Sequence, residues 1–145
     1  MTDRWFPDGM PTPGVSLDSR AWWDAAADHR LVVQRCGGCG ARRHPPAPVC
    51  AECSSTDVGW DEVGPRGTVY TFTIVRQPFL PGTEDVVPYV VAAVELADAP
   101  GVRIFTNVVG DGAIDVSIGE AVEIVFEDMG PEFAVPRALR SGPRP

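Results

Sequence analysis

Four cysteines occur in one short stretch and are arranged as two C-x-x-C pairs. Cys36 and Cys39 form the first pair, Cys50 and Cys53 form the second, and ten residues separate the pairs. Two such pairs can bring four thiolates to one tetrahedral cation, which is the ligand set of a structural zinc site. The glycines around the first pair suit tight turns, because glycine adopts a positive φ at little cost. The spacing predicts one bound zinc ion, with iron in a rubredoxin-like site as the alternative.

Other uses of these thiols fit the sequence less well. Two disulfides would be typical of an exported protein, and the first residues do not resemble a secretory leader. A thioredoxin-type redox centre uses a single C-x-x-C pair in a βαβ setting. A site with four cysteine ligands has no open position for water or substrate, so we expect its metal to be structural and its binding energy to be largely folding energy.

Residues that could carry out catalysis are sparse elsewhere in the chain. We expect His44 to be a loop residue, because the four cysteines already complete the metal site, and we place His29 near a helix end. The sequence has no Gly-x-Ser-x-Gly nucleophile elbow and no lysine to form a Schiff base. Acidic pairs such as Glu84-Asp85 lie beside turns and are typical of solvated charge. The chain is therefore predicted not to be an enzyme in its own right.

Composition limits the possible partners. The chain has a formal net charge of −8 and 44% hydrophobic residues, which is typical of a globular domain. An acidic balance argues against nucleic acid, because phosphate binding depends on clustered basic charge. No apolar run approaches the roughly 20 residues that cross a bilayer. We expect a soluble, cytoplasmic protein.

The elements that must position the cysteines can be predicted along the chain. A proline- and glycine-rich flexible arm precedes a helix that Asp18 or Ser19 can cap, and Trp23, Ala27 and Leu31 form one stripe on that helix. The cysteine segment follows, and period-two alternation then predicts five short strands of a closed or nearly closed antiparallel barrel. The predicted parts are the arm 1–17, the helix 18–32, the zinc ribbon 33–61, the barrel 62–139 with strands at 68–76, 89–96, 102–109, 121–127 and 134–139, and the tail 140–145.

A series of short motifs along residues 18–139 resembles a known family, the proteins in which a rubredoxin-like zinc ribbon precedes an OB-fold. That family was long catalogued as a domain of unknown function and is associated with acyl-CoA metabolism. The motifs that carry the resemblance are Ala21-Trp22-Trp23, the run Leu31 to Cys36, Cys39-Gly40, Pro45-Pro46, the run Cys50 to Cys53, Trp60, the run Gly67 to Thr73, the run Pro88 to Val91, and the run Ile118 to Val122.

The resemblance implies more than the residues show by themselves. It implies that the chain is mostly β, with an N-terminal helix, a zinc ribbon with four cysteine ligands and a five-stranded OB-fold over residues 62–139. It also implies a non-catalytic accessory subunit of a thiolase-like acyl-CoA enzyme: a thiolase, an acyltransferase or an aldolase that shortens steroid side chains. The catalytic residues would lie on the partner, and this chain would help to form the acyl-CoA site. A homodimeric partner offers two equivalent surfaces, so we expect a two-plus-two heterotetramer.

Large aromatic residues are the predicted contacts with that partner. Trp22, Trp23, Trp60, Phe79 and Tyr89 are more rings than one ribbon and a small barrel readily bury, and aromatic residues are common interface anchors. Two alternatives stay open. The two tryptophans of the helix can instead pack it on the domain, and the loop that carries Phe79 can fold back over the barrel.

CoA contact and nucleic-acid binding complete the predictions. Arg42 and Arg43 are the candidate contacts for a CoA phosphate, although solubility alone also explains them. The alternative function is a nucleic-acid-binding ribbon and OB-fold module, in which Tyr70, Phe72 and Tyr89 would stack on bases. An iron electron carrier is a third hypothesis.

Overall fold

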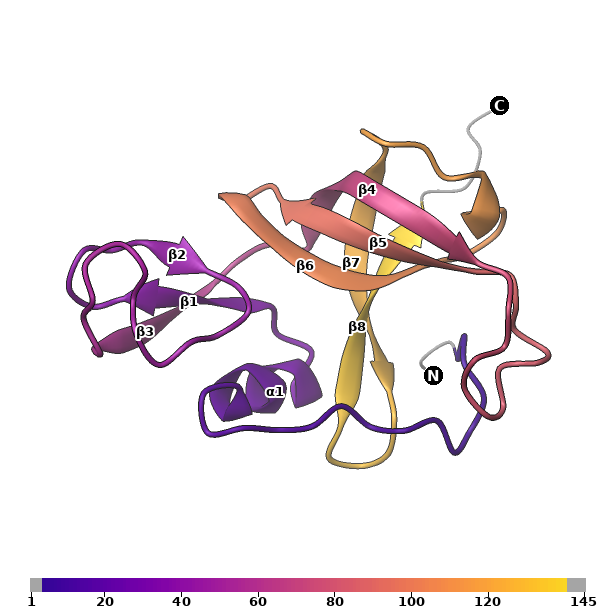
Figure 1. Cartoon of the computed structure of the whole chain (residues 1–145), viewed down its shortest axis with the longest axis horizontal. Helices are drawn as coiled ribbons and strands as arrows, with labels where there is room; N and C mark the ends of the chain where they lie inside the picture. The colour runs from indigo at the N-terminus through magenta and orange to yellow at the C-terminus, as the bar shows by residue number, and fades with distance from the viewer. Residues whose placement is uncertain (1–3, 141–145) are drawn as a thin grey trace.

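The computed structural model describes residues 4–140, so the parts of the predicted arm and tail at 1–3 and 141–145 lie outside the described residues. Within the described chain, the predicted order of helix, cysteine-bearing ribbon and five-stranded barrel is confirmed. Figure 1 shows the ribbon beside the barrel, with the helix below the space between them. The protein is therefore mostly β, and the helix packs against both parts.

Helix α1 (Arg20–Ala27) is shorter than the predicted 18–32. Ser19 holds the N-cap position, although its side chain makes no capping hydrogen bond. The helix ends early because His29 adopts a left-handed φ of 57°. The N–H groups of His29 and Arg30 bond back to carbonyls of the last turn, which is the Schellman arrangement. In residues 4–140 no helix is both long and apolar enough to cross a membrane.

The ribbon is a three-stranded antiparallel sheet in the order β2-β1-β3. Its strands are β1 (Val32–Cys36), β2 (Arg42–Arg43) and β3 (Val58–Glu62). β1 pairs with β3 from one end to the other, so that Cys36 lies opposite Val58. The sheet spans one residue more on each side than the predicted ribbon 33–61. Its central strand ends at the first cysteine, which places the metal cluster at the tip of the ribbon.

The barrel closes in the order β4-β5-β6-β8-β7, and β7 pairs with β4. All neighbouring strands are antiparallel except β6 and β8, which run parallel. The prediction of a purely antiparallel barrel is wrong at this seam, because an odd number of strands cannot alternate in direction around a closed ring. The strands are β4 (Arg66–Val75), β5 (Tyr89–Leu96), β6 (Ala99–Val109), β7 (Ala121–Asp128) and β8 (Ala134–Arg140), and a 3-10 turn (Ala113–Asp115) lies between β6 and β7.

A β-bulge changes which side chains of β4 face inward. The register of β4 on β5 shifts between Val69 and Thr71, so two consecutive positions oppose one. Val69 before the bulge is buried, and Phe72 and Ile74 after it pack against the core, whereas Tyr70 is exposed. Simple alternation along the predicted strand 68–76 would put Tyr70 on the same face as Phe72 and Ile74, and the bulge explains why it is not there.

The hydrophobic core runs continuously from the barrel interior to α1 and the start of β1. Inside the barrel it consists mostly of aliphatic residues at alternate positions, and each fully buried valine or isoleucine among them stabilises the fold by roughly 1.5–3 kcal/mol. On the barrel side these include Val69, Val90, Val94, Ile104, Val108, Val122, Ile124 and Ala138. Trp22, Ala25 and Ala26 of α1 extend the same cluster. The helix thus joins the ribbon to the barrel through shared packing.

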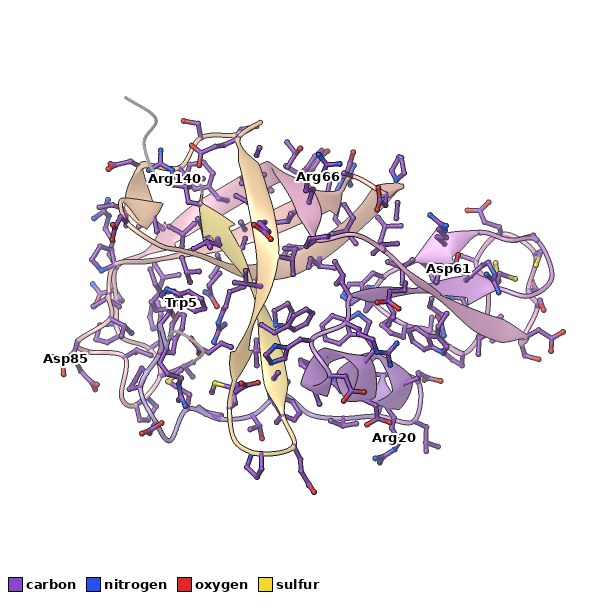
Figure 2. The ribbon with its side chains drawn as sticks, turned by 180° about the vertical axis from the view of Figure 1, so that it is seen from behind. Trp5, Arg20, Asp61, Arg66, Asp85 and Arg140 are labelled. Atoms are coloured by element: carbon purple, nitrogen blue, oxygen red, sulfur yellow. The ribbon has the colours of Figure 1, made fainter. Side chains whose placement is uncertain are left out.

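The proline-rich arm is anchored on the barrel near its start. Phe6 is buried, with its ring edge-on to Tyr89 and the guanidinium of Arg137 4.4 Å from its centre. The N–H of Trp5, labelled beside the barrel in Figure 2, donates to Glu127 at 2.5 Å. Glu127 lies on the outer face of β7, as alternation predicts, yet it is 0% exposed because the arm covers it. The predicted arm is therefore in contact with the barrel at Trp5 and Phe6.

Candidate metal centre

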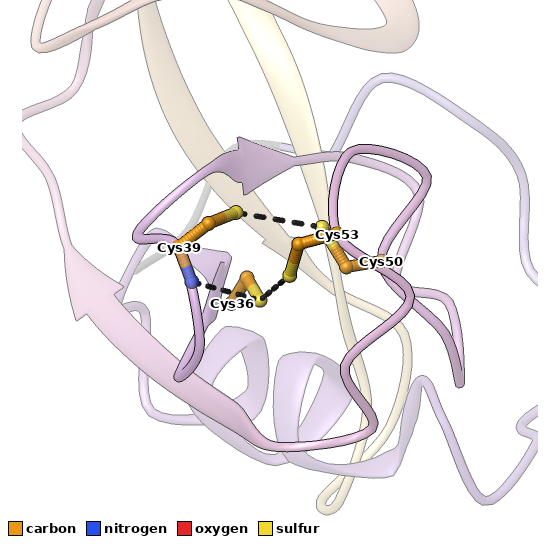
Figure 3. A group of neighbouring side chains, drawn as sticks. All are labelled: Cys36, Cys39, Cys50 and Cys53. Atoms are coloured by element: carbon orange, nitrogen blue, oxygen red, sulfur yellow. Dashed lines mark hydrogen bonds between the residues drawn. The ribbon is translucent and has the colours of Figure 1, made fainter.

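The four cysteine sulfurs lie within 4.8 Å of one another (Figure 3). Cys36 Sγ is 3.5 Å from Cys53 Sγ, and Cys39 Sγ is 3.7 Å from Cys50 Sγ. Zinc–sulfur bonds of about 2.3 Å in a tetrahedron hold sulfurs about 3.8 Å apart, which agrees with these separations. The distances exclude disulfides, and all four residues are free thiols. The geometry suits a tetrahedral cation with four protein ligands.

Backbone amides around the sulfurs form two knuckles. The N–H groups of Gly38 and Cys39 donate to Cys36 Sγ at 3.3 and 3.5 Å, and the N–H of Glu52 donates to Cys50 Sγ at 3.4 Å. These partial positive charges favour thiolates over thiols. The two knuckles thus place donors on one sulfur of each cysteine pair, Cys36 Sγ and Cys50 Sγ.

The glycines of the first knuckle are required for two different reasons. Gly40 has a φ of 79°, as predicted for a tight turn. Gly37 and Gly38 do not have a positive φ, but they lie against the second knuckle. A Cβ on Gly37 would be 2.8 Å from Asp57 Cβ, and one on Gly38 would be 2.9 Å from Ser55 Cβ. Steric approach between the two cysteine turns therefore accounts for this pair.

The pKa values of Cys36, Cys50 and Cys53 do not shift in the same direction. Hydrogen bonds from the amides of Cys39 and Gly38 lower the pKa of Cys36 to about 6, although burial acts in the opposite direction. The amide of Cys53 is the main reason that the pKa of Cys50 is also lowered. The pKa of Cys53 rises to about 12: the Ser55 amide lowers it, but the thiols of Cys36 and Cys39 and burial outweigh that effect. A coordinated divalent cation is what makes all four residues thiolates together.

The two histidines lie outside this cluster. In residues 4–140 the four cysteines are the group that could hold a metal ion. His44 packs on Trp22 with ring centres 5.3 Å apart, and burial lowers its pKa to about 4, so it is neutral near pH 7. His29 Nε2 is 2.6 Å from Asp128 Oδ1 on β7. Neither imidazole is placed to complete a catalytic group with the cysteines.

The arginines predicted to contact CoA make hydrogen bonds within the chain. Arg42 donates to Asp61 Oδ2 at 3.0 Å and to a backbone carbonyl at the β5–β6 turn at 2.7 Å. Arg43 donates to Gln34 Oε1 at 2.6 Å and to the carbonyl of Ala47 at 3.0 Å. Asp61 is labelled on the ribbon in Figure 2. Arg42 therefore links the ribbon to the barrel, and Arg43 fixes the loop between the cysteine pairs.

The five aromatic residues predicted at an interface differ in exposure. Trp22 is only 6% exposed, which corrects the expectation that its ring is available to a partner. Its ring meets that of Trp23 edge-on. Trp23 in turn stacks on Phe133 of the β7–β8 turn, with ring centres 4.8 Å apart. Trp60 and Tyr89 are half-buried, and Phe79 is 79% exposed. Packing on the domain, one of the two alternatives for the helix, is what the structure shows for Trp22.

One large exposed ring was missed from the sequence. Phe105 on β6 is 76% exposed. The alternation that places Val102, Ile104 and Thr106 on one face of β6 also places Phe105 on the opposite face, so the pattern carried the signal. Phe105 therefore joins Phe79 as an aromatic side chain on the surface.

Comparison with known proteins finds a family match for both the ribbon and the barrel. A family profile described as "ChsH2, rubredoxin-like zinc ribbon domain" matches residues 23–59, and one described as "ChsH2, C-terminal OB-fold domain" matches residues 60–127. A solved chain from a structure named "Ltp2-ChsH2(DUF35) aldolase" superimposes with a TM-score of 0.79 at 36% identity. The match covers 90% of this chain and 99% of that one.

Two relatives carry informative names. A probable enoyl-CoA hydratase alpha subunit of Thermomonospora curvata is 41% identical over 128 residues, which is 87% of this chain and 38% of that protein. A DUF35 domain-containing scaffold protein of Methanothermobacter thermautotrophicus is 27% identical over 114 residues, 78% of this chain and 84% of that protein. The chain spans about two fifths of the length of the hydratase subunit that it matches.

The match to the zinc ribbon profile includes all four cysteines, and their sulfurs lie within 4.8 Å of one another. Cys36, Cys39, Cys50 and Cys53 are therefore the ligands of a zinc ion. With a matching ribbon, a matching barrel and a similar solved chain aligned over almost its whole length, this chain belongs to the ChsH2 family of zinc-ribbon and OB-fold proteins, also known as DUF35.

Proposed function

We propose that this chain is a non-catalytic accessory subunit that assembles with a thiolase-like acyl-CoA enzyme and stabilises it. The observation that carries the proposal is the 36% identity, over nearly the full length, to a chain of an Ltp2-ChsH2(DUF35) aldolase. The name of the archaeal relative, a scaffold protein, supports the same role. The acyl-CoA chemistry would then belong to the partner, whether it is a thiolase, an acyltransferase or a side-chain aldolase.

The zinc site supports a structural role. Its four ligands come from the protein, so the ion has no open position at which to activate water or polarise a thioester. Buried charge elsewhere in the described chain is used for packing: Glu127 pairs with Arg137 at 3.1 Å, and both are buried. These features favour a chain that relies on its partner for nucleophile, acid and base.

The loop between β4 and β5 is the proposed anchor for the partner. Phe79 and Leu80 in this loop are 79% and 44% exposed. The loop is held in place because Thr83, which is buried, donates its hydroxyl to the carbonyl of Leu80 at 2.5 Å. Two apolar side chains are thus presented to solvent on an ordered turn, which lowers the entropic cost of docking. An aromatic anchor of this kind is typical of interface hot spots.

CoA contact is proposed at Arg42 rather than at Arg43. Arg42 is exposed on the ribbon, and its charge is shared with an aspartate at the surface. Arg43 is half-buried and already committed to Gln34 and Ala47. No specific observation favours the nucleic-acid alternative, in which Tyr70 and Tyr89 would stack on bases. The guanidinium of Arg103 lies over the Tyr70 ring, 3.7 Å from its centre, and the Tyr89 ring meets the buried Phe6.

Co-expression with a thiolase-like enzyme from the same organism tests the assembly. Native mass measurement should show two copies of each chain, because a dimeric partner offers two equivalent surfaces. Phe79→Asp should abolish the complex, whereas Ile118→Asp, which adds the same charge at another exposed apolar position, should leave it intact. The proposal fails if the wild-type chain does not bind such an enzyme. The role of Phe79 fails if Phe79→Asp assembles normally.

A further inference from the structure

Solvent reaches the four zinc ligands unequally. Cys36 and Cys50, the first cysteine of each pair, are buried at 1% and 2% exposure. Cys39 and Cys53, the second cysteine of each pair, are exposed. A small reagent in solution therefore meets Cys39 or Cys53 before it meets the other two. Oxidation of a cysteine depends on such access, because the oxidant must touch the sulfur itself.

Backbone amides distinguish the two exposed cysteines from each other. The sulfurs of Cys36 and Cys50 accept hydrogen bonds from amides within their own turns, and the amide of Ser55 acts on the sulfur of Cys53. In the part of the chain that the structure describes, no N–H group donates to Cys39 Sγ, whose polar contact is the sulfur of Cys50. An N–H donor draws electron density from a thiolate, so the sulfur without such a donor is the stronger nucleophile.

The space around the two exposed cysteines also differs. A Cβ on Gly38 would lie 3.3 Å from Cys53 Sγ, so the first cysteine turn backs onto that sulfur. At Gly40, directly after Cys39, a Cβ would have no atom within 4 Å apart from its neighbours in the chain. Exposure, the lack of an amide donor and open surroundings thus select Cys39 among the four ligands.

A second sulfur lies within reach of Cys39. Cys39 Sγ is 3.7 Å from Cys50 Sγ, a contact that Figure 3 marks with a dashed line. A disulfide bond of about 2.0 Å would need these two sulfurs to approach by about 1.7 Å. The contact joins the two C-x-x-C pairs, so a disulfide formed from Cys39 would link one cysteine turn to the other.

We propose that Cys39 is the site at which hydrogen peroxide oxidises the cluster, that Cys50 completes a disulfide with it, and that the ribbon then loses its zinc. The inference goes beyond the proposed function and does not rest on it, because every group in it belongs to this chain.

Two steps balance the reaction. In the first, the Cys39 thiolate attacks one peroxide oxygen, the O–O bond breaks, and the departing hydroxide takes a proton from the buffer, which leaves Cys39 as a sulfenic acid. In the second, the Cys50 thiolate attacks the Cys39 sulfur, the S–O bond breaks, and the second hydroxide takes a proton. Two thiolates, one peroxide and two protons give one disulfide and two waters. The thiolates of Cys36 and Cys53 alone do not make a closed zinc site.

Peptide mapping of the zinc-loaded full chain tests both residues. The chain is treated anaerobically with equimolar hydrogen peroxide, quenched with catalase, alkylated with N-ethylmaleimide under denaturing conditions and digested with trypsin. Cleavage after arginine leaves the first cysteine pair on peptide 36–42 and the second pair on peptide 44–66. A disulfide between Cys39 and Cys50 joins the two peptides, with the alkyl label on the other two cysteines. A disulfide within either pair leaves the peptides separate.

Zinc release is the second measurement. A chromogenic chelator should report about one zinc per chain, released at a rate that rises in proportion to the peroxide concentration and that matches the appearance of the joined peptides. A release rate that does not depend on peroxide would show that the thiols oxidise only after the metal has left, which would overturn the proposal.

Two matched variants separate the roles of the exposed cysteines. Cys39→His and Cys53→His each keep four ligands, because three cysteines and one histidine also form a structural zinc site. Cys39→His should slow the release of zinc by peroxide about tenfold, because the open sulfur is gone. Cys53→His keeps Cys39 and Cys50, so its release rate should stay within about twofold of wild type. If either variant binds no zinc, the peptide map of the wild-type chain decides.

Three results from these experiments would contradict the assigned residues. A first disulfide within one cysteine pair, or between Cys36 and Cys53, would show that the contact of Cys39 with Cys50 does not direct the reaction. A sulfinic acid on Cys39 without any disulfide would exclude Cys50 as its partner. Equal release rates from the two histidine variants, or retention of zinc in excess peroxide, would show that Cys39 is not the sensitive residue.

Discussion

His44 makes the stability of this protein depend on pH in a direction that the structure fixes. Its ring packs on the buried Trp22, and its Nδ1 has no partner among the described residues. Burial lowers the pKa from 6.5 to about 4, because an imidazolium ion in this position would lose its hydration. In the unfolded chain the ring recovers its ordinary pKa. As the pH falls from 6.5 towards 4, the unfolded state therefore takes up a proton that the folded state does not bind.

The size of this effect follows from the two pKa values. Above pH 7 both states are neutral at this ring, and it contributes no pH dependence. At pH 5 the free energy of unfolding should be lower by roughly 2 kcal/mol, and below pH 4 the loss should level off at roughly 3 kcal/mol. The sign is that of a base with a depressed pKa in the folded state: stability rises with pH between about 4 and 6.5.

Urea unfolding at pH 7.5, 6.5, 5.5 and 5.0 measures the effect against His44→Phe, which keeps a ring on Trp22 but cannot be protonated. The cysteines also release metal in acid, so zinc content is measured in every sample, and the difference between the two proteins removes this shared contribution. That difference should change by about 2 kcal/mol in favour of the variant between pH 7.5 and pH 5. A difference that stays constant with pH would refute the argument from burial.

Three further predictions concern the metal, the barrel and the surface. Cys50→Ala should reduce zinc from about one ion per chain to a small fraction in elemental analysis and lower the soluble yield, because ligation replaces a core in the ribbon; unchanged zinc and melting would contradict this. Gly67→Ala should cost about 1–3 kcal/mol in urea unfolding, since its Cβ would lie 2.5 Å from Val94 Cγ1, whereas Gly14→Ala, with no atom within 4 Å, should be neutral. Phe79→Asp should leave the melting temperature of the isolated chain within about 2 °C of wild type, because its side chain is exposed; a large drop would show that the loop packs on the barrel.

Local patterns in the sequence were sufficient for the metal site and for most of the strands. The two C-x-x-C pairs predict the cluster because ligand spacing is set by a few neighbouring residues. The predicted strand 89–96 coincides with β5 (Tyr89–Leu96), and 121–127 falls one residue short of β7 (Ala121–Asp128). β5 is a short apolar run with Glu95 near its end, and in β7 the apolar Val122, Ile124 and Phe126 alternate with a face that carries Glu123 and Glu127. Turn residues mark the ends of both strands.

Features that depend on distant segments were not predictable in the same way. Glu127 alternates outward like an exposed carboxylate, yet it is buried and accepts a hydrogen bond from the backbone N–H of Trp5, 122 residues earlier. Trp22 is buried by contacts with the ribbon loop and the barrel. The apolar stripe of the helix sequence does not reveal either contact. The position of Tyr70 required knowledge of a bulge, which appears only once β4 is paired with β5. The differences between the predicted and observed positions of these residues therefore come from contacts with segments distant in the sequence, which local propensity does not describe.

The parallel seam of the barrel sets an order of events during synthesis. β6 and β8 meet through two residue pairs, Val108 with Ala138 and Val109 with Leu139, so the ring cannot close until β8 has left the ribosome. The zinc ligands are complete at Cys53, about 80 residues earlier, which corresponds to several seconds of translation at about 5–20 residues per second. All four zinc ligands therefore leave the ribosome before the strand that closes the barrel. If zinc binds the ribbon at that stage, zinc-starved cells should accumulate chains whose ribbon has not folded when the barrel strands emerge.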